Sequence, residues 1–147
     1  MWCPSAQCVR HDEEMESRHV SVWINAAPEV VYEFASDPHD WPRWAAGLAR
    51  GGLRQTVDGW VADSPMGQVT VEFAPPNEFG VLDHVVRVPS GEAVYNPLRV
   101  VPGGVGESRC EVVFTVRRRV GMTDEELDAD VAAVRADLET LRRLLED

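Results

Sequence analysis

Alternating apolar and polar residues predict the first strand of the chain. Val20, Val22 and Ile24 fall on one side of the segment, and polar or large residues fall on the other. This period of two is typical of a strand that is buried on one face only. We therefore expect the folded domain to begin near residue 18, after an N-terminal tail.

Two short helices are predicted after this strand. Pro28 stands at the first position of one helix, where its missing N–H costs nothing, and the Asp-Pro dipeptide at 37–38 ends it. The second helix carries an apolar stripe at a spacing of three and four residues, and Gly51 follows it. The residues of that stripe are Trp41, Trp44 and Leu48.

An Asp-Gly dipeptide at 58–59 separates the stretches LRQTV and WVADS. Such a dipeptide favours a two-residue type I′ hairpin turn. This turn predicts that Val57 pairs with Trp60. It also places Arg54 opposite Asp63, where they can form an ion pair on the surface.

Later segments predict further antiparallel strands, and their pattern tests the register. These segments are QVTVEF at 68–73, Phe79–Val88, Glu92–Val101 and Glu107–Arg118. In the last three, the even-numbered positions within 82–88, 94–100 and 110–116 are apolar except for His84 and Asn96. Turns of about three and five residues keep these positions on one face, with His84 opposite Asn96 and Asn96 opposite Val112.

The chain ends in a long predicted helix. Thr123-Asp124-Glu125-Glu126 is a capping box. Apolar residues then recur every three or four positions, so this face must cover the sheet. They are Leu127, Val131, Val134, Leu138, Leu141 and Leu145. The predicted class is α+β, with an antiparallel sheet of about six to seven strands wrapped around the C-terminal helix, a helix-grip arrangement.

Three stretches of the sequence carry a family resemblance. They are VSVWINAAPEVVYEFASDPHDWPRW, VEFAPPNEFGVLDHVVRVPSGEAVYNPLRVVP and the helix start GMTDEEL. The first resembles the opening of the START-like (SRPBCC) superfamily, which includes polyketide cyclase/dehydrase-like and lipid-transfer proteins. The others resemble a bacterial subgroup of unestablished function. The resemblance covers residues 18–146 and implies a ligand pocket between helix and sheet, but no single catalytic motif.

Composition narrows the range of partners. The chain has 147 residues and a formal net charge of −11, with 14 basic residues, all arginine, against 25 Asp and Glu. This field repels phosphate backbones, so nucleic acid is not an expected partner. The apolar stretches are far shorter than the roughly 18–20 residues of a membrane helix, so no membrane span is expected. The length fits one domain, 18–147, after a disordered tail, 1–17.

The three cysteines do not form a disulfide framework. Cys3, Cys8 and His11 match no common zinc spacing, so neither a metal nor a cofactor is expected. The first 17 residues lack the features of a secretory signal, and a cytoplasmic location is predicted. Met15 precedes the first periodic segment, so translation from Met1 and from Met15 both remain open.

His84 and Asn96 are the polar exceptions on the predicted inward face. Three interpretations of His84 stay open: a core histidine paired with the Asn96 amide and a backbone carbonyl, a ligand contact, or an acid/base catalyst. Asp83 points to the opposite face, so the two cannot form a carboxylate–imidazole dyad. The expected pocket is lined by His84, Asn96, Trp60, Trp44, Val71, Val86, Leu98, Val112 and Phe114, with both tryptophans near its mouth, although large aromatics are also ordinary core residues.

The leading functional hypothesis is a protein that binds a small apolar or weakly polar molecule, lipid-like or polyketide-like, between the helix and the sheet. One alternative is a cyclase or dehydratase in which His84 moves a proton beside a carbonyl that Asn96 polarises. Another is a structural or regulatory protein whose cavity is filled by its own aromatic residues. The oligomeric state is not predicted.

Overall fold

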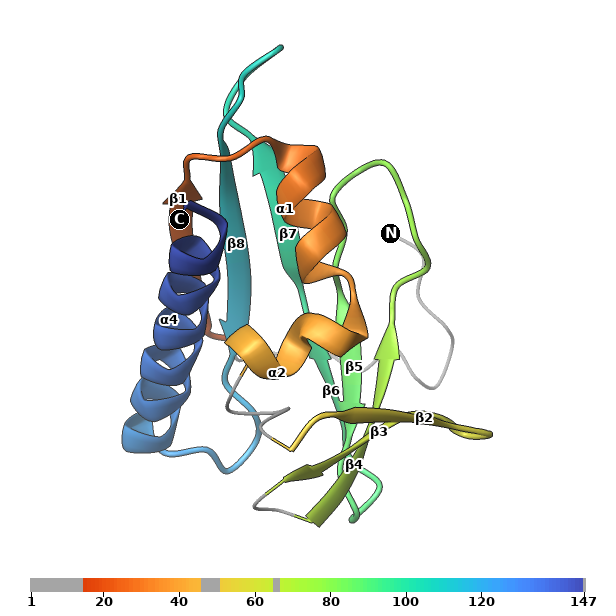
Figure 1. The fold of residues 1–147 in the computed structure, drawn as a ribbon. Helices are drawn as coiled ribbons and strands as arrows, with labels where there is room; N and C mark the ends of the chain where they lie inside the picture. The colour runs from red at the N-terminus through yellow and green to blue at the C-terminus, as the bar shows by residue number, and fades with distance from the viewer. Residues whose placement is uncertain (1–14, 46–50, 65–66, 147) are drawn as a thin grey trace, which may run out of the picture.

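The computed structural model describes residues 15–45, 51–64 and 67–146. Its strands form two antiparallel sheets (Figure 1). The three-stranded sheet has the order β1 (Ser17–Ile24), β8 (Cys110–Arg117), β7 (Leu98–Pro102). The five-stranded sheet has the order β2 (Leu53–Thr56), β3 (Gly59–Ser64), β4 (Gly67–Phe73), β5 (His84–Arg87), β6 (Ala93–Asn96).

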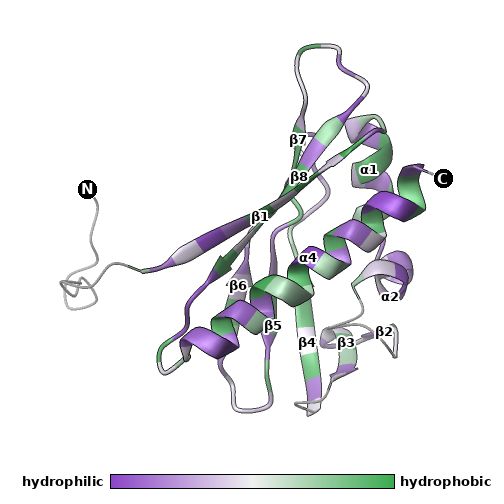
Figure 2. Ribbon diagram, turned by 90° about the vertical axis from the view of Figure 1, so that its left-hand side faces the viewer, coloured by the Kyte–Doolittle hydropathy of each residue, from purple (hydrophilic) through white to green (hydrophobic). Residues whose placement is uncertain are grey.

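The helices lie on one side of the sheets. Two short helices, α1 (Pro28–Ala35) and α2 (Trp41–Trp44), follow β1 with the 3-10 turn η2 (Pro38–Asp40) between them. The long helix α4 (Asp124–Glu146) runs diagonally across the strands and contacts β1, β8 and α2 (Figure 2). The predicted α+β arrangement is confirmed. Leu48 of the expected second helix lies outside the described residues.

The apolar stripe of α4 faces inward, as its spacing predicts. Leu127, Leu138 and Leu141 are almost completely buried, and the other stripe residues are partly buried. The capping box is also confirmed: the Glu126 amide donates to Thr123 Oγ1 at 3.1 Å, and the Thr123 amide donates to Glu126 Oε1 at 3.0 Å. No helix in the described part of the chain is long and apolar enough to cross a membrane.

The expected continuous strand over 92–101 is broken at Pro97. Before it, β6 pairs with β5; after it, β7 pairs with β8. Proline has no N–H for a strand ladder, so pairing changes partner at this residue. The two sheets remain connected here, because Val81 bridges to Arg99 and the Leu82 amide donates to Leu98 O at 2.8 Å.

The predicted register of the first hairpin is wrong by two residues. Thr56 pairs with Gly59, so Val57 does not pair with Trp60. A type I′ turn needs a positive φ at both central residues, whereas among the described residues only glycines have one, and Gly59 has φ 106°. The Thr56 hydroxyl holds the turn that forms instead, accepting from the Asp58 amide at 3.1 Å and donating to Gly59 O at 3.0 Å.

The predicted ion pair of this hairpin forms, but diagonally. Arg54 lies 3.1 Å from Asp63 through Nη1 and Oδ2, while its partner in the ladder is Val61. The shift of two residues is even, so the side chains keep the predicted faces. Leu53 accordingly pairs with Ala62 on the inward face.

The pairing of Asn96 with Val112 is also wrong. Val112 pairs with Val100, because the loop between β7 and β8 is longer than expected. Gly103 donates to Arg109 O at 3.0 Å and Glu107 donates to Gly104 O at 3.2 Å, so the turn takes up residues assigned to the strand. The displacement is four residues, and the predicted faces are again preserved.

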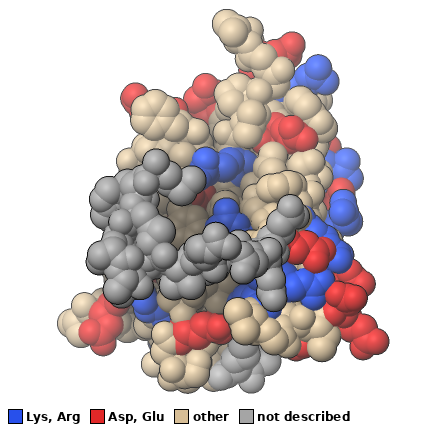
Figure 3. Space-filling view, turned by 180° about the vertical axis from the view of Figure 1, so that it is seen from behind, with Lys and Arg blue, Asp and Glu red and all other residues tan. Residues whose placement is uncertain are grey.

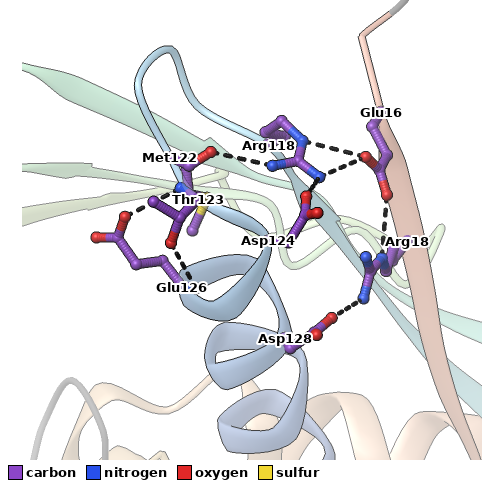
Figure 4. Close-up of polar contacts among 8 residues, drawn as sticks. All are labelled: Glu16, Arg18, Arg118, Met122, Thr123, Asp124, Glu126 and Asp128. Atoms are coloured by element: carbon purple, nitrogen blue, oxygen red, sulfur yellow. Dashed lines mark hydrogen bonds and ion pairs between the residues drawn. The ribbon is translucent and has the colours of Figure 1, made fainter.

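A polar cluster joins the start of β1, the end of β8 and the start of α4 (Figure 4). Arg118 lies 2.8 Å from Glu16 and 2.6 Å from Asp124, and Arg18 binds both Glu16 and Asp128. Glu16 and Ser17 therefore belong to the fold, although the expected tail included them. Residues 1–14 of that tail, with Cys3, Cys8 and His11, lie outside the described residues.

Candidate functional site

The buried apolar side chains form two clusters. The larger contains residues of β1, β7, β8 and the helices, and the smaller contains Ala62, Val69, Val71 and Val86 from the five-stranded sheet. Leu53 and Phe73 are partly buried and pack against both clusters. The junction of the clusters is the place where the inward faces of the two sheets meet.

His84 lies at this junction, at the first position of β5. Its ring makes edge-on contacts with Trp41, at 4.9 Å between ring centroids, and with Phe114, at 5.9 Å. Phe73, its cross-strand partner, is tilted against it at 6.3 Å. His84 is thus enclosed by aromatic rings from α2, β4 and β8, and only 4% of it is exposed.

The imidazole makes one hydrogen bond within the described residues. Its Nδ1 lies 3.1 Å from the carbonyl oxygen of Leu82. Burial lowers the pKa of His84 to about 4, against the weaker opposing effects of that carbonyl and the Asp83 charge. His84 is therefore a neutral imidazole at pH 7.

Asn96 lies directly across from His84, and this part of the predicted register is confirmed. The expected hydrogen bond between the two side chains is absent from the described contacts. Asn96 Nδ2 instead donates to Val94 O at 3.2 Å, in its own strand. The two polar residues therefore share a face and a register position without satisfying each other.

The other predicted lining residues divide between the two clusters. Val71 and Val86 are paired across β4 and β5 in the smaller cluster, with Trp60 packed against them. The larger cluster takes Trp44, Leu98, Val112 and Phe114. His84 connects the two groups through Phe73 and Phe114.

The two tryptophans expected near the mouth have different positions. Trp60 is partly buried and makes an edge-on contact with His39, at 5.6 Å. Trp44 is only 3% exposed and packs on Trp41 at 5.2 Å, so it is a core residue. Its indole Nε1 is fully enclosed and has no hydrogen-bond partner among the described residues, whereas Trp41 Nε1 donates to Ala35 O at 2.8 Å.

A cavity of about 100 Å³ lies next to Trp41 and Phe73. It is lined by Tyr32, Ala35, Ser36, Trp41, Phe73, Ala74, Pro76 and Leu82. None of the nine predicted lining residues borders it. Trp41 and Phe73 both border the cavity and contact the His84 ring. The sequence marks both as apolar and inward, but gives no sign of this space.

Asp83 is the most extensively bonded side chain near the site, and its partners could not be predicted from the sequence pattern. Its Oδ1 accepts from the Leu98 amide and from Arg99 Nε, each at 2.9 Å. Its Oδ2 accepts from Tyr95 Oη at 2.6 Å and from Arg99 Nη2 at 2.8 Å. The Arg99 guanidinium holds the pKa of this carboxyl well below its usual range, with help from Tyr95 and the Leu98 amide.

Asp83 and its partners belong to the outer side of the sheets. Tyr95 and Arg99 are each about half exposed, and basic and acidic side chains are interspersed on this side (Figure 3). No carboxylate contacts the His84 ring within the described residues, as the opposite faces of Asp83 and His84 predict. The described residues also contain no group of three or more His, Cys, Asp and Glu that could bind a metal.

These elements define a class of protein. Two short helices after β1, antiparallel strands and a long C-terminal helix that packs on them make a START-like α+β fold. Residues 15–146 match the family of polyketide cyclase / dehydrase and lipid transport proteins, and the chain belongs to this family. No curated protein matches the sequence.

Solved structures with low sequence identity share the fold. XoxI from Bacillus cereus is 16% identical, with a TM-score of 0.69 over 90% of this chain and 97% of that one. A START superfamily protein from Mycobacterium smegmatis is 12% identical, with a TM-score of 0.64 over 88% and 97%. The di-domain ARO/CYC BexL from the BE-7585A biosynthetic pathway is 17% identical, with a TM-score of 0.59 over 88% of this chain and 46% of that one.

Proposed function

We propose that this protein binds a small, neutral and largely apolar molecule at the junction of its two apolar clusters. The observation that carries the proposal is His84, a buried neutral imidazole among Trp41, Phe73 and Phe114 that uses only one of its two nitrogens in the described structure. Apolar walls with a few placed polar groups are the usual composition of a small-molecule site. Family membership supports the same class of ligand.

The proposed contact residues extend the set expected from sequence. His84 and Asn96 would orient one polar group of the ligand, and the apolar walls would come from Val71, Val86, Leu98, Val112, Phe114, Trp44 and Trp60. Trp41 and Phe73 join this set because both touch His84. The cavity of about 100 Å³ next to them would give these rings room to move when a ligand arrives.

The enzymatic alternative has less support. A general acid or base works best with a pKa near the working pH. With a pKa of about 4, only about one His84 in a thousand carries the proton at pH 7. We therefore favour binding over catalysis. A free, buried Cys110 fits a reducing compartment such as the cytoplasm, which we propose as the location.

Ligand titration by tryptophan fluorescence or calorimetry tests the proposal. A panel of planar aromatic, acyl-chain and phosphorylated compounds should show binding of neutral compounds only. His84→Ala should weaken that binding by about 1–3 kcal/mol, because the polar group of the ligand loses its buried partner. Tyr95→Phe is the matched control: it changes one hydrogen bond on the outer side and should leave affinity unchanged. Equal losses in both variants, or tight binding of phosphorylated compounds alone, would contradict the proposal.

A further inference from the structure

The carbonyl of Leu82 determines which nitrogen of His84 carries the proton. A backbone carbonyl oxygen only accepts hydrogen bonds, so the Nδ1 that lies 3.1 Å from it must donate. A neutral imidazole has a single N–H, and this one is at Nδ1. The other nitrogen, Nε2, therefore presents a lone pair and can only accept.

The lone pair of Nε2 has no hydrogen-bond partner within the described residues. Only 4% of His84 is exposed, so a ligand has to enter between the aromatic rings around it to reach Nε2.

The surroundings of the ring disfavour a charged ligand. Within the described residues, the His84 ring contacts the aromatic rings of Trp41, Phe73 and Phe114. No basic side chain contacts the ring among the described residues, and the nearest charge along the chain is the carboxylate of Asp83. A carboxylate ligand would face a lone pair without a cation to compensate it.

We propose that the site selects a ligand that presents a hydroxyl group, as a hydrogen-bond donor, to His84 Nε2. The matching ether and the matching carboxylate are disfavoured, because neither donates at neutral pH. This inference rests on the proposed function and adds the polarity of the bound group. A site built around an acceptor discriminates against analogues that lack the donor, since the acceptor then stays buried and unpaired.

The test measures the affinity of the full chain for matched compounds built on two carbon skeletons, one aromatic and one aliphatic. The probes are β-naphthol, its methyl ether and β-naphthoate, together with decanol, its methyl ether and decanoate. On the skeleton that binds, the wild-type protein should prefer the alcohol about tenfold over the ether, the ratio that corresponds to one hydrogen bond. In His84→Phe, which keeps a ring but loses both nitrogens, the alcohol and the ether should bind equally. Tyr95→Phe should retain the preference.

A second measurement needs no variant. Nitrogen NMR of the wild-type imidazole should show a protonated Nδ1 and an unprotonated Nε2, and the alcohol alone should shift the Nε2 resonance. Equal affinity for alcohol and ether, a preference that survives in His84→Phe, or a protonated Nε2 would overturn the inference while leaving the proposed function intact. Binding by none of the six probes would overturn the proposed function itself.

Discussion

Asp83 and His84 are neighbours in the chain and are equally buried, at 4% exposed each, but their surroundings are opposite. On the outer side, the Asp83 carboxylate accepts four hydrogen bonds from Tyr95, Leu98 and Arg99. On the inner side, the His84 imidazole makes one hydrogen bond within the described residues and otherwise touches aromatic rings.

The difference separates a structural group from a candidate binding group. Pro97 interrupts the strand ladder, and the amide of the next residue, Leu98, donates to the Asp83 carboxylate instead of to a neighbouring strand. Asp83 therefore satisfies a backbone group at the break. Buried polar groups are normally paired in this way. An incompletely paired group such as His84 lowers stability, and such exceptions are expected at functional sites.

Removing the carboxylate of Asp83 should have the largest effect on stability. Asp83→Ala leaves the buried Leu98 amide and the Arg99 guanidinium without their acceptor. We expect the free energy of unfolding to fall by about 3–4 kcal/mol, near the low end for a broken buried ion pair because Arg99 is half exposed. Urea titration measures this loss.

Asp83→Asn is the control for that experiment, because it keeps one oxygen acceptor and the side-chain volume. It should lose clearly less stability than Asp83→Ala. If both variants lose less than about 1 kcal/mol, a typical contribution of a single hydrogen bond, the outer cluster is not the structural element described above.

The second largest effect should come from acidification, which should destabilise the protein through His84 at a higher pH than through Asp83. The pKa of His84 is about 4 in the folded protein and about 6.5 unfolded, so the unfolded state binds more protons between these values. Burial of the neutral imidazole therefore imposes no protonation penalty on folding above pH 6.5. As the pH falls toward 4, the free energy of unfolding decreases, because the unfolded state gains the proton first. The loss should be about 3 kcal/mol between pH 7 and pH 4.

His84→Phe removes this titration, so its stability should depend less on pH over the same interval when both proteins are unfolded by urea. Asp83 acts at lower pH: because its pKa is depressed in the folded protein, its carboxylate stabilises the fold fully above about pH 3.8, and that contribution is lost as the pH falls further. Parallel pH curves for wild type and His84→Phe would show that His84 is not buried in its neutral form.

The two core tryptophans test pairing within the inner region. Trp41→Phe leaves Ala35 O without its 2.8 Å donor, whereas Trp44→Phe removes an indole N–H that has no partner in the described part of the chain. Both substitutions lose similar apolar volume. Trp41→Phe should therefore cost about 1–2 kcal/mol more than Trp44→Phe. Thermal or urea unfolding measures the difference, and an equal cost would contradict the assigned pairing.

Tyr95→Phe should have the smallest effect. It removes the 2.6 Å hydrogen bond from the Tyr95 hydroxyl to Asp83, but three other donors remain on that carboxylate. Because Tyr95 is half exposed, water replaces part of the lost interaction. We expect a loss of about 0.5–1 kcal/mol in the free energy of unfolding. A loss as large as that of Asp83→Ala would mean that Tyr95, rather than Arg99, dominates the cluster.

The sequence predicted the faces of the strands better than their pairing. Alternation constrains only whether a position is even or odd, so shifts of two and four residues left the faces of the paired residues unchanged. Val57, which the predicted register placed on the inward face with Trp60, lies in the turn instead and is fully exposed. The loop lengths depend on individual hydrogen bonds, such as those of the Thr56 hydroxyl and the Gly104 carbonyl. No hydrophobic pattern contains that information.

The residues of the candidate site could be proposed from sequence, but their side-chain contacts could not. His84 and Asn96 interrupt an apolar face, which identified them, and their cross-strand pairing is confirmed. The partners of each side chain depend on the break at Pro97 and on rings from distant elements. Asp83 shows this most clearly, because Tyr95 and Arg99 are 12 and 16 residues away and reach it only once β6 and β7 are placed.

The cluster that joins Glu16, Arg118 and Asp124 has a consequence for synthesis on the ribosome (Figure 4). The strand β1 emerges first, yet its partner in the sheet is β8, with Ser17 paired to Arg117. At usual translation rates the intervening residues take about 5–20 s to appear, while the β2–β6 meander can already form from local contacts. During that interval β1 lacks its partner strand and the helix that packs on it, so closure of the domain waits for β8 and α4.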